Sequence, residues 1–453
     1  MVEKAYQRLK HYILNNIIGS LVLPIILLNS NNLAAQEIKI ISDEETEVLL
    51  EEITQPLFKA AGLPFNRNEV YIVEDNSLNA FVADGNNLFI NTGTIIAAES
   101  PNEIAGVIAH ETGHIAGGHI IRQKLKNRNI NEVSLVSAIA AGAAAALSGR
   151  ADVAMAAMLG SQSSILTNYT RYRTEEERSA DDAAIKLLKQ TKQSPQGMLA
   201  FMKKIVARNQ LQGIEETPYF RTHPITRERI SFFEQASKNS NLSPISELQN
   251  KFNNVKAKLI AYLLPPTQTL KQYAKSNRID AHYARAIAYF RMLNISKALN
   301  EINILLQKES DNPYFHELKG QIFLETGKIK QAKSEYKKAL EIMPSSALFQ
   351  ISFAQTLLED NHSQSDIQEA INLLNKAIIK RPNSFAWLLL SRAYGLQENL
   401  GYANYAAAEY SLRIGAPETA QEQLKQSLTY NPDQTLKIKI ADLQNKLDNL
   451  LKK

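Results

Sequence analysis

Cysteine is absent from all 453 residues of this chain. The absence excludes a disulfide framework, and it excludes a lipid anchor attached to an N-terminal cysteine. The folded protein must therefore be held together by its packed cores alone, and a chain of this length is expected to contain two or three domains.

The sequence also lacks the charge pattern of a nucleic-acid-binding protein. Lysine and arginine number 51 against 46 aspartates and glutamates, which gives a formal net charge of +5, and the sequence pI is about 8.9. Lysines alternate with glutamates along the expected helical faces, and no basic stripe with interleaved aromatic residues is visible. We therefore expect no nucleic acid among its partners.

What the chain does contain is a His-Glu-x-x-His motif at residues 110–114. Side chains four residues apart share one face of a helix, so His110 and His114 can direct imidazole nitrogens at one metal ion. Glu111, beside them, is placed to take a proton from a metal-bound water, whose pKa a zinc ion lowers. The spacing predicts one Zn²⁺ per chain, with His110 and His114 as metal ligands and Glu111 as a catalytic residue.

A third ligand must come from elsewhere, because catalytic zinc usually has three protein ligands. Five residues of helix turn His119 roughly 140° away from His114, so we expect His119 to make a local hydrogen bond instead. Spacing favours Glu177, within the glutamate run at 175–177, as the carboxylate ligand. Asp181, one turn later, can then hydrogen-bond the outer nitrogen of a metal-binding histidine and fix its tautomer, which makes it the second predicted catalytic residue.

His110-Glu111-x-x-His114 followed by Glu177-x-x-Ala180-Asp181 resembles the gluzincin superfamily of metallopeptidases, which includes HtpX, the CAAX prenyl proteases and the periplasmic BepA-type proteases. Three further segments carry the same resemblance: Asn79-Ala80-Phe81, Ile90-Asn91-Thr92-Gly93, and Thr222-His223-Pro224 with Arg229-Ile230. The first two look like the family's hairpin, whose edge strand pairs with extended substrate, and the third looks like its Thr-His-Pro segment. By this resemblance, His223 is expected as a regulatory fourth ligand in a latent state or as a transition-state contact in an active one.

The resemblance implies a zinc-dependent metalloendopeptidase of the cell envelope. For the BepA type it implies degradation of misassembled outer-membrane proteins, assistance to their assembly, and contact with the barrel assembly machinery through a repeat domain. A second interpretation is an assembly chaperone or adaptor whose proteolytic activity is latent, and a third is an integral membrane protease. The chain departs from the family just before Glu177, where Arg173 and Thr174 stand in place of a Ser-Arg pair, and Arg171 or Arg173 would substitute for the arginine of that pair.

Residues 1–35 fit a secretory signal peptide. Basic residues precede an apolar stretch from Ile13 to Leu28, and Leu33-Ala34-Ala35 is typical of a cleavage site. Cleavage after Ala35 would deliver the mature chain to the periplasm of a Gram-negative bacterium. The alternative is an uncleaved membrane anchor.

A second apolar segment, residues 133–166, contains only Arg150 and Asp152 as charges. It is too interrupted to predict a transmembrane helix. We expect either a helical hairpin packed in the core or a lid that faces substrate or makes a peripheral membrane contact.

From about residue 255 the chain becomes helical in pattern, and the pattern repeats. An alanine precedes a proline by the same 12 positions at three places: Ala332 and Pro344, Ala370 and Pro382, and Ala420 and Pro432. This is typical of the second helix of a tetratricopeptide repeat. We expect about four degenerate units in a solenoid whose concave face binds other chains or which, alternatively, only stabilises the first domain.

The predicted fold is mainly α: a gluzincin-type zinc protease domain of helices and a small mixed sheet, followed by an α-solenoid. The predicted divisions are a signal peptide at 1–35, a metalloprotease domain at 36–254 and a tetratricopeptide-repeat domain at 255–453. Within the protease domain we expect a helix near 42–61, short strands at 70–73, 79–82 and 88–91, and an active-site helix opened by Pro101.

Overall fold

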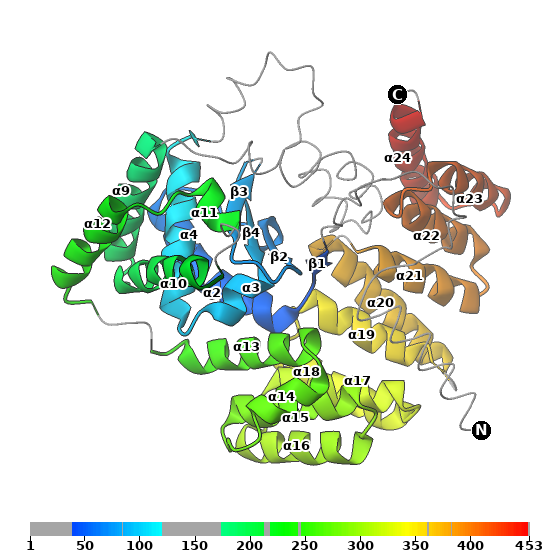
Figure 1. Ribbon diagram of the computed structural model, residues 1–453. Coiled ribbons are helices and arrows are strands. Elements are labelled where there is room, and N and C mark those ends of the chain that lie inside the picture. The colour runs from blue at the N-terminus through cyan, green and yellow to red at the C-terminus, as the bar shows by residue number, and fades with distance from the viewer. Residues whose placement is uncertain are drawn as a thin grey trace, which may run out of the picture.

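The computed structural model (Figure 1) describes residues 39–83, 85–119, 174–212, 218–242, 246–359, 362–381 and 383–451. The predicted signal peptide, the apolar segment at 133–166, and Arg171 and Arg173 lie outside these residues. Over the described residues the protein is mainly helical with one small sheet, which confirms the predicted fold class. None of the helices in this part of the chain is both long and apolar enough to cross a membrane.

The sheet has four short strands, in the order β1-β2-β4-β3. They are β1 (Ile40–Ile41), β2 (Val70–Val73), β3 (Ala80–Ala83) and β4 (Asn87–Asn91). β2 and β4 are parallel, whereas β1 pairs with β2 and β3 pairs with β4 in antiparallel fashion. The predicted strands are therefore present, and β3 lies at an edge of the sheet, as expected for the hairpin.

Helix α4 (Pro101–Ala116) runs through the core and carries the His-Glu-x-x-His motif. Pro101 occupies its first turn, where a missing N–H costs nothing. Two glycines allow neighbouring helices to approach closely. A Cβ at Gly113 would lie 2.7 Å from the carbonyl oxygen of Ala180 on α9, and one at Gly106 would lie 2.5 Å from the backbone nitrogen of Met198 on α10. α9 therefore packs closely against α4 within the motif, and α10 packs against α4 one turn before it.

The remaining helices of this part surround α4 and the sheet (Figure 1). They are α2 (Glu44–Ala60), α3 (Thr92–Ala97), α9 (Thr174–Gln190), α10 (Gln196–Gln212), α11 (Pro218–Thr222) and α12 (Arg227–Lys238). Apolar side chains of α2, α4, α9, α10 and the strands form one continuous core.

The second part of the chain is an array of helices packed in sequence along the lower and right-hand sides of Figure 1. Four helix pairs follow α14 (Pro266–Gln272): α15 and α16 (Ile279–Arg291, Ile295–Lys308), α17 and α18 (Pro313–Glu325, Ile329–Ile342), α19 and α20 (Ala347–Leu357, Gln364–Lys380), and α22 and α23 (Leu400–Arg413, Pro417–Thr429). Helix α21 (Ser384–Leu396) lies between the third and fourth pairs, and α24 (Gln434–Leu451) ends the array. The alanines that predicted the repeat are fully buried between helices.

A repeated ion pair shows the period of the array directly. His282 Nδ1 lies 2.5 Å from a carboxylate oxygen of Glu301, and His316 Nδ1 lies 2.6 Å from one of Glu335. Both members of the second pair follow those of the first by 34 positions, which is the length of a tetratricopeptide repeat. The sequence analysis assigned nothing to these histidines, and their partners show that they hold the two helices of a repeat together.

Helix α13 (Gln249–Leu263) belongs to both parts of the chain. Phe252 and Val255 pack into the core of the first part, whereas Ala257 and Ala261 pack into the core of the first repeats. The division proposed between residues 254 and 255 therefore falls inside one continuous helix.

The start of α2 connects the two parts as well. Its N-cap and first turn carry four carboxylates, here called the α2 acidic turn: Asp43, Glu44, Glu45 and Glu47. Each of them contacts one donor from the helices that follow. The pairs are Asp43 with Lys258 on α13, Glu44 with Ser346 before α19, Glu45 with Tyr283 on α15, and Glu47 with Arg381 after α20. The array is thus attached to one helix turn along much of its length.

Candidate metal centre

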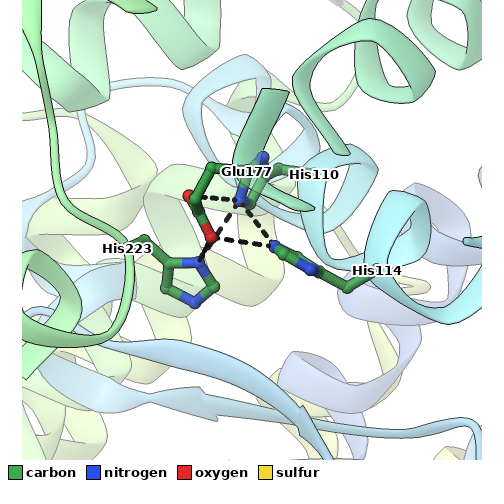
Figure 2. Close-up of side chains that lie close together, drawn as sticks. All are labelled: His110, His114, Glu177 and His223. Carbon is green, nitrogen blue, oxygen red and sulfur yellow. Dashed lines mark hydrogen bonds and ion pairs between the residues drawn. The ribbon is translucent and has the colours of Figure 1, made fainter. Parts of the chain in front are cut away.

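The two histidines of α4 direct the same ring nitrogen at one point. Nε2 of His114 lies 3.1 Å from Nε2 of His110, and both rings are fully buried. Helix α9 brings Glu177 opposite them, with one carboxylate oxygen 3.3 Å from His114 Nε2 and the other 3.5 Å from His110 Nε2. Figure 2 shows the three side chains converging from the two helices.

His223, directly after α11, completes the group. Its Nδ1 atom lies 2.9 Å from Glu177 and 3.3 Å from His110 Nε2. One ligand atom from each of the four residues lies within 4.8 Å of the others, and all four residues are buried. Three imidazoles and a carboxylate are a donor set that suits a divalent transition metal such as zinc.

Glu111 lies beside this group without a hydrogen bond to its carboxylate. Its side chain is fully buried, and neither carboxylate oxygen has a hydrogen-bond partner among the described residues. Its Oε1 atom lies 3.4 Å from His223 Nε2. Burial raises the pKa of the Glu111 carboxyl above its ordinary value. A buried carboxylate without a hydrogen bond is costly, so the arrangement fits a site that a metal ion and its water would complete.

The outer nitrogens of the two motif histidines also have partners. Asp181 Oδ1 lies 2.8 Å from His110 Nδ1, which leaves Nε2 of that ring to face the group. His119 Nδ1 lies 2.8 Å from His114 Nδ1, on the side of the ring away from the four ligand atoms. The structure therefore places Asp181 and His119 where the sequence analysis expected them.

Among the three glutamates at the start of α9, only Glu177 reaches the group. Glu175 is exposed, and Glu176 is buried but contributes no atom to the four-residue cluster. Of the other described histidines, His282 and His316 form the ion pairs of the repeats, and the ring of His362 faces the carbonyl of Glu359.

Arg229 on α12 is the residue whose part in the site the sequence analysis missed. It named Arg229 only as part of a resembling segment. The guanidinium is buried, with Nε 2.6 Å and Nη2 2.9 Å from the two oxygens of Asp181, and Nη1 2.5 Å from Glu177. In the sequence, Arg229 is marked only by its position six residues after His223. Because that spacing says nothing about burial, the role of the side chain could not be predicted from it.

Opposite charges set the protonation of the group. Burial by itself lowers the pKa of His110, but hydrogen bonds with Asp181 and Glu177 raise it to about 9. Burial lowers the pKa of His114 well below its ordinary value. Against the effect of burial, His223 and the hydrogen bonds of the other histidines hold the pKa of Glu177 well below its usual range. Glu177 is therefore an anion, and a cation bound at Nε2 of His110 competes there with a proton.

The ring of Tyr219 packs against the imidazole of His223. The two rings stack with centroids 4.6 Å apart and an interplanar angle of 29°. The tyrosine is fully buried, and its hydroxyl has no hydrogen-bond partner among the described residues. The Tyr219 hydroxyl lies in the same buried region as Glu111. Burial is the main reason that the pKa of Tyr219 is raised, and the charge of Glu111 raises it further.

Comparison with known proteins matches the chain to a peptidase family and to several proteases. Residues 44–237 match the model of Peptidase family M48. The chain is 23% identical over 385 residues to the beta-barrel assembly-enhancing protease of Escherichia coli (strain K12), covering 83% of this chain and 75% of that protein. It is 22% identical to the protein of the same name from Yersinia pestis, with 83% and 76% covered. It is 29% identical over 168 residues to Metalloprotease LoiP of Escherichia coli (strain K12), with 37% and 61% covered.

Solved structures of helical-repeat proteins are also similar. Yeast Tom70 aligns with a TM-score of 0.36 and 13% identity over 88% of this chain and 75% of that one. The tetratricopeptide repeat protein YrrB aligns with a TM-score of 0.28 and 16% identity over 42% of this chain and 91% of that one.

Proposed function

Because the chain carries a Peptidase family M48 domain over residues 44–237, we propose that it is a zinc-dependent endopeptidase of the cell envelope. The observation that supports this most strongly is the buried group of His110, His114, Glu177 and His223, beside which the Glu111 carboxylate lies without a hydrogen bond. His110, His114 and Glu177 are the proposed metal ligands. A bound zinc ion would polarise the scissile carbonyl and acidify a water molecule.

The chain's own residues supply the proton transfers. Glu111 would take a proton from the attacking water and pass it to the leaving amine, and burial, which raises the pKa of its carboxyl, makes that group a stronger base. Asp181 accepts the Nδ1 hydrogen of His110 and so holds that ring in one tautomer. The buried setting excludes bulk water from these transfers.

We place the substrate along β3. This strand is at the edge of the sheet among the described strands, and α4 packs against it. An extended peptide can add to such an edge through backbone hydrogen bonds, which brings its carbonyl groups past the motif helix.

The proposed biological role follows from the relatives. Two of them are named as beta-barrel assembly-enhancing proteases and align over most of this chain. We propose that this protein acts in the periplasm, reached through the signal peptide at 1–35, on misassembled outer-membrane proteins. The helical array at 255–453 would bind the barrel assembly machinery or deliver its substrates.

The test compares the purified full chain with its Glu111→Gln variant on an unfolded outer-membrane protein, at equal measured zinc content. We expect the wild type to cleave and the variant to lose on the order of 10²-fold or more in rate, because Gln accepts no proton. Equal cleavage by both proteins, or no cleavage by a zinc-loaded wild type, would contradict the proposal.

A second candidate function is supported by the position of His223. Its Nδ1 atom already stands among the ligand atoms, where a fourth protein ligand would leave no open position for water. In that case the protein acts mainly as a chaperone or adaptor of barrel assembly with latent proteolysis. Cleavage by His223→Ala but not by the wild type would favour this reading, and the reverse would exclude it.

A further inference from the structure

One guanidinium contacts three residues around the metal centre, two of them on α9 and one directly after His223. Arg229 on α12 reaches Asp181 and Glu177 on α9, and it donates from Nη1 to the backbone oxygen of Pro224, the residue after His223, at 3.0 Å. We propose that Arg229 is a positioning residue that sets the orientation of the metal ligands. The inference rests on the metal site of the proposed function.

The contact with Asp181 is forked. Nε and Nη2 each face one carboxylate oxygen, at 2.6 and 2.9 Å, so the plane of the carboxylate is fixed by two parallel interactions. The oxygen that faces Nη2 is also the one that lies 2.8 Å from His110 Nδ1. Arg229 therefore determines the direction in which Asp181 holds the imidazole of His110.

The contact with Glu177 acts on the ligand itself. Nη1 lies 2.5 Å from one carboxylate oxygen, while the other oxygen lies 2.9 Å from His223 and 3.3 Å from His114 Nε2. The oxygen held by Arg229 also lies 3.5 Å from His110 Nε2, and the other oxygen faces His114 and His223. The hydrogen bond to Pro224 holds the backbone next to His223 in the same frame. Three of the four ligand residues are thus oriented through one side chain that is 7% exposed.

Two possible roles of Arg229, as a charge and as a positioning residue, predict opposite changes in metal affinity when Arg229 is removed. A positive charge this close to a divalent cation repels it, so if Arg229 acted only as a charge, its removal would strengthen metal binding. If Arg229 positions the ligands, its removal weakens binding even though the repulsion is gone. A lysine keeps the charge but lacks the planar fork, so it cannot hold both oxygens of Asp181 together with Glu177.

The experiment measures zinc affinity of the full chain by competition with a chelator, for wild type, Arg229→Lys and Arg229→Met. Arg227→Lys and Arg227→Met are the matched controls, because Arg227 lies on the same helix and is exposed. We expect both Arg229 variants to bind zinc roughly 10- to 100-fold more weakly, as is usual when the partner of a ligand is lost, and both controls to bind as the wild type does. The visible spectrum of the Co²⁺-loaded Arg229→Lys protein should also change, because the ligand geometry changes.

The outcomes separate the two proposals. If the wild type binds no zinc, the proposed function and this inference both fail. If the wild type binds zinc and Arg229→Lys binds it equally well, with an unchanged Co²⁺ spectrum, only the positioning role is overturned. If Arg229→Met binds zinc more tightly than the wild type, Arg229 acts only through its charge. Should the Met variant fail to fold, Asp181→Asn tests the same contact from its other end. It should weaken zinc binding by a similar factor, and its effect should not add to that of Arg229→Lys, whereas full additivity would contradict a shared contact.

Discussion

The phenol of Tyr283, on the first helix of the repeat array, donates a hydrogen bond of 2.9 Å to the carboxylate of Glu45, on the helix that packs beside the metal-binding motif. Both side chains are buried, and 238 residues of chain separate them. The same α2 acidic turn takes Lys258, Ser346 and Arg381 from other parts of the array. The junction between the two parts is therefore polar and dry, and its energetics can be tested residue by residue.

Removing Lys258, the buried cation of this junction, should lower the free energy of unfolding strongly. Lys258→Met leaves Asp43 and Glu45 buried without their positive partner, which costs about 3–5 kcal/mol. The free energy of unfolding in urea measures the loss. Lys251→Met is the control, because its pair with Glu52 is half exposed and should contribute less than about 1 kcal/mol. Equal effects of the two substitutions would show that the junction is not a buried ion pair in solution.

Stability should also depend on pH through Glu45. Burial raises the pKa of Glu45 to about 7 despite the nearby Lys258, whereas its ordinary value is 4.5. The folded state therefore holds the proton more tightly than the unfolded state. This contribution is fully present below pH 4.5 and is lost as the pH rises to 7, by up to about 3 kcal/mol.

Glu45→Gln isolates this contribution, because glutamine keeps an acceptor for Tyr283 but does not ionise. Unfolding of both proteins is followed between pH 4.5 and pH 8. The difference in stability between variant and wild type should grow across this interval in favour of the variant. A constant difference would mean that Glu45 ionises in the folded protein as it does in the unfolded chain.

A methyl group at Gly113 should disturb the metal centre without touching a ligand. Its Cβ would lie 2.7 Å from a backbone oxygen of α9, so Gly113→Ala must push α9, and Glu177 with it, away from the motif helix. We expect a loss of about 1–3 kcal/mol in stability and weaker zinc binding. Gly395→Ala is the control, since a Cβ there meets no atom within 4 Å and alanine favours the helix. Unchanged zinc affinity in Gly113→Ala would show that the two helices can separate freely.

Zinc should stabilise the folded protein by mass action. At a free concentration about 100 times the dissociation constant, the expected gain is about 2.7 kcal/mol, which a rise in the melting temperature reports. His114→Ala should abolish the rise because it removes a proposed zinc ligand. His316→Ala, which breaks an ion pair in the array, should lower the melting temperature but keep the rise. A rise that persists in His114→Ala would place the zinc elsewhere.

Helical periodicity explains why part of the site was predictable. His110 and His114 lie one turn apart on one helix, and Glu177 and Asp181 lie one turn apart on another, so each pair could be placed on a face from spacing alone. The contact of Arg229 with both carboxylates depends on how α12 crosses α9, which no local pattern encodes. The same holds for Tyr219, whose stacking on His223 depends on the short helix α11.

The fold was predictable to a similar extent. Apolar runs bounded by turns predicted the strands at 70–73, 79–82 and 88–91, but β1 has only two residues and carries no pattern of its own. The alanine and proline spacing indicated the repeats, although the paired His282 and Glu301 that mark the period were not recognised. The α2 acidic turn reads as an ordinary helix start rich in acidic residues, and its distant partners became visible only in three dimensions.

Helix α13 has a consequence for how such a chain could be rebuilt. One face of this helix completes the core beneath the metal centre and another begins the stack of repeats. A graft that joined a foreign array at residue 255 would discard Leu259 from the peptidase core, and one that cut before Gln249 would strip Ala257 and Ala261 from the array. The two halves therefore do not exchange as independent modules, and a working chimera has to keep the whole of α13 together with the partners of the α2 acidic turn.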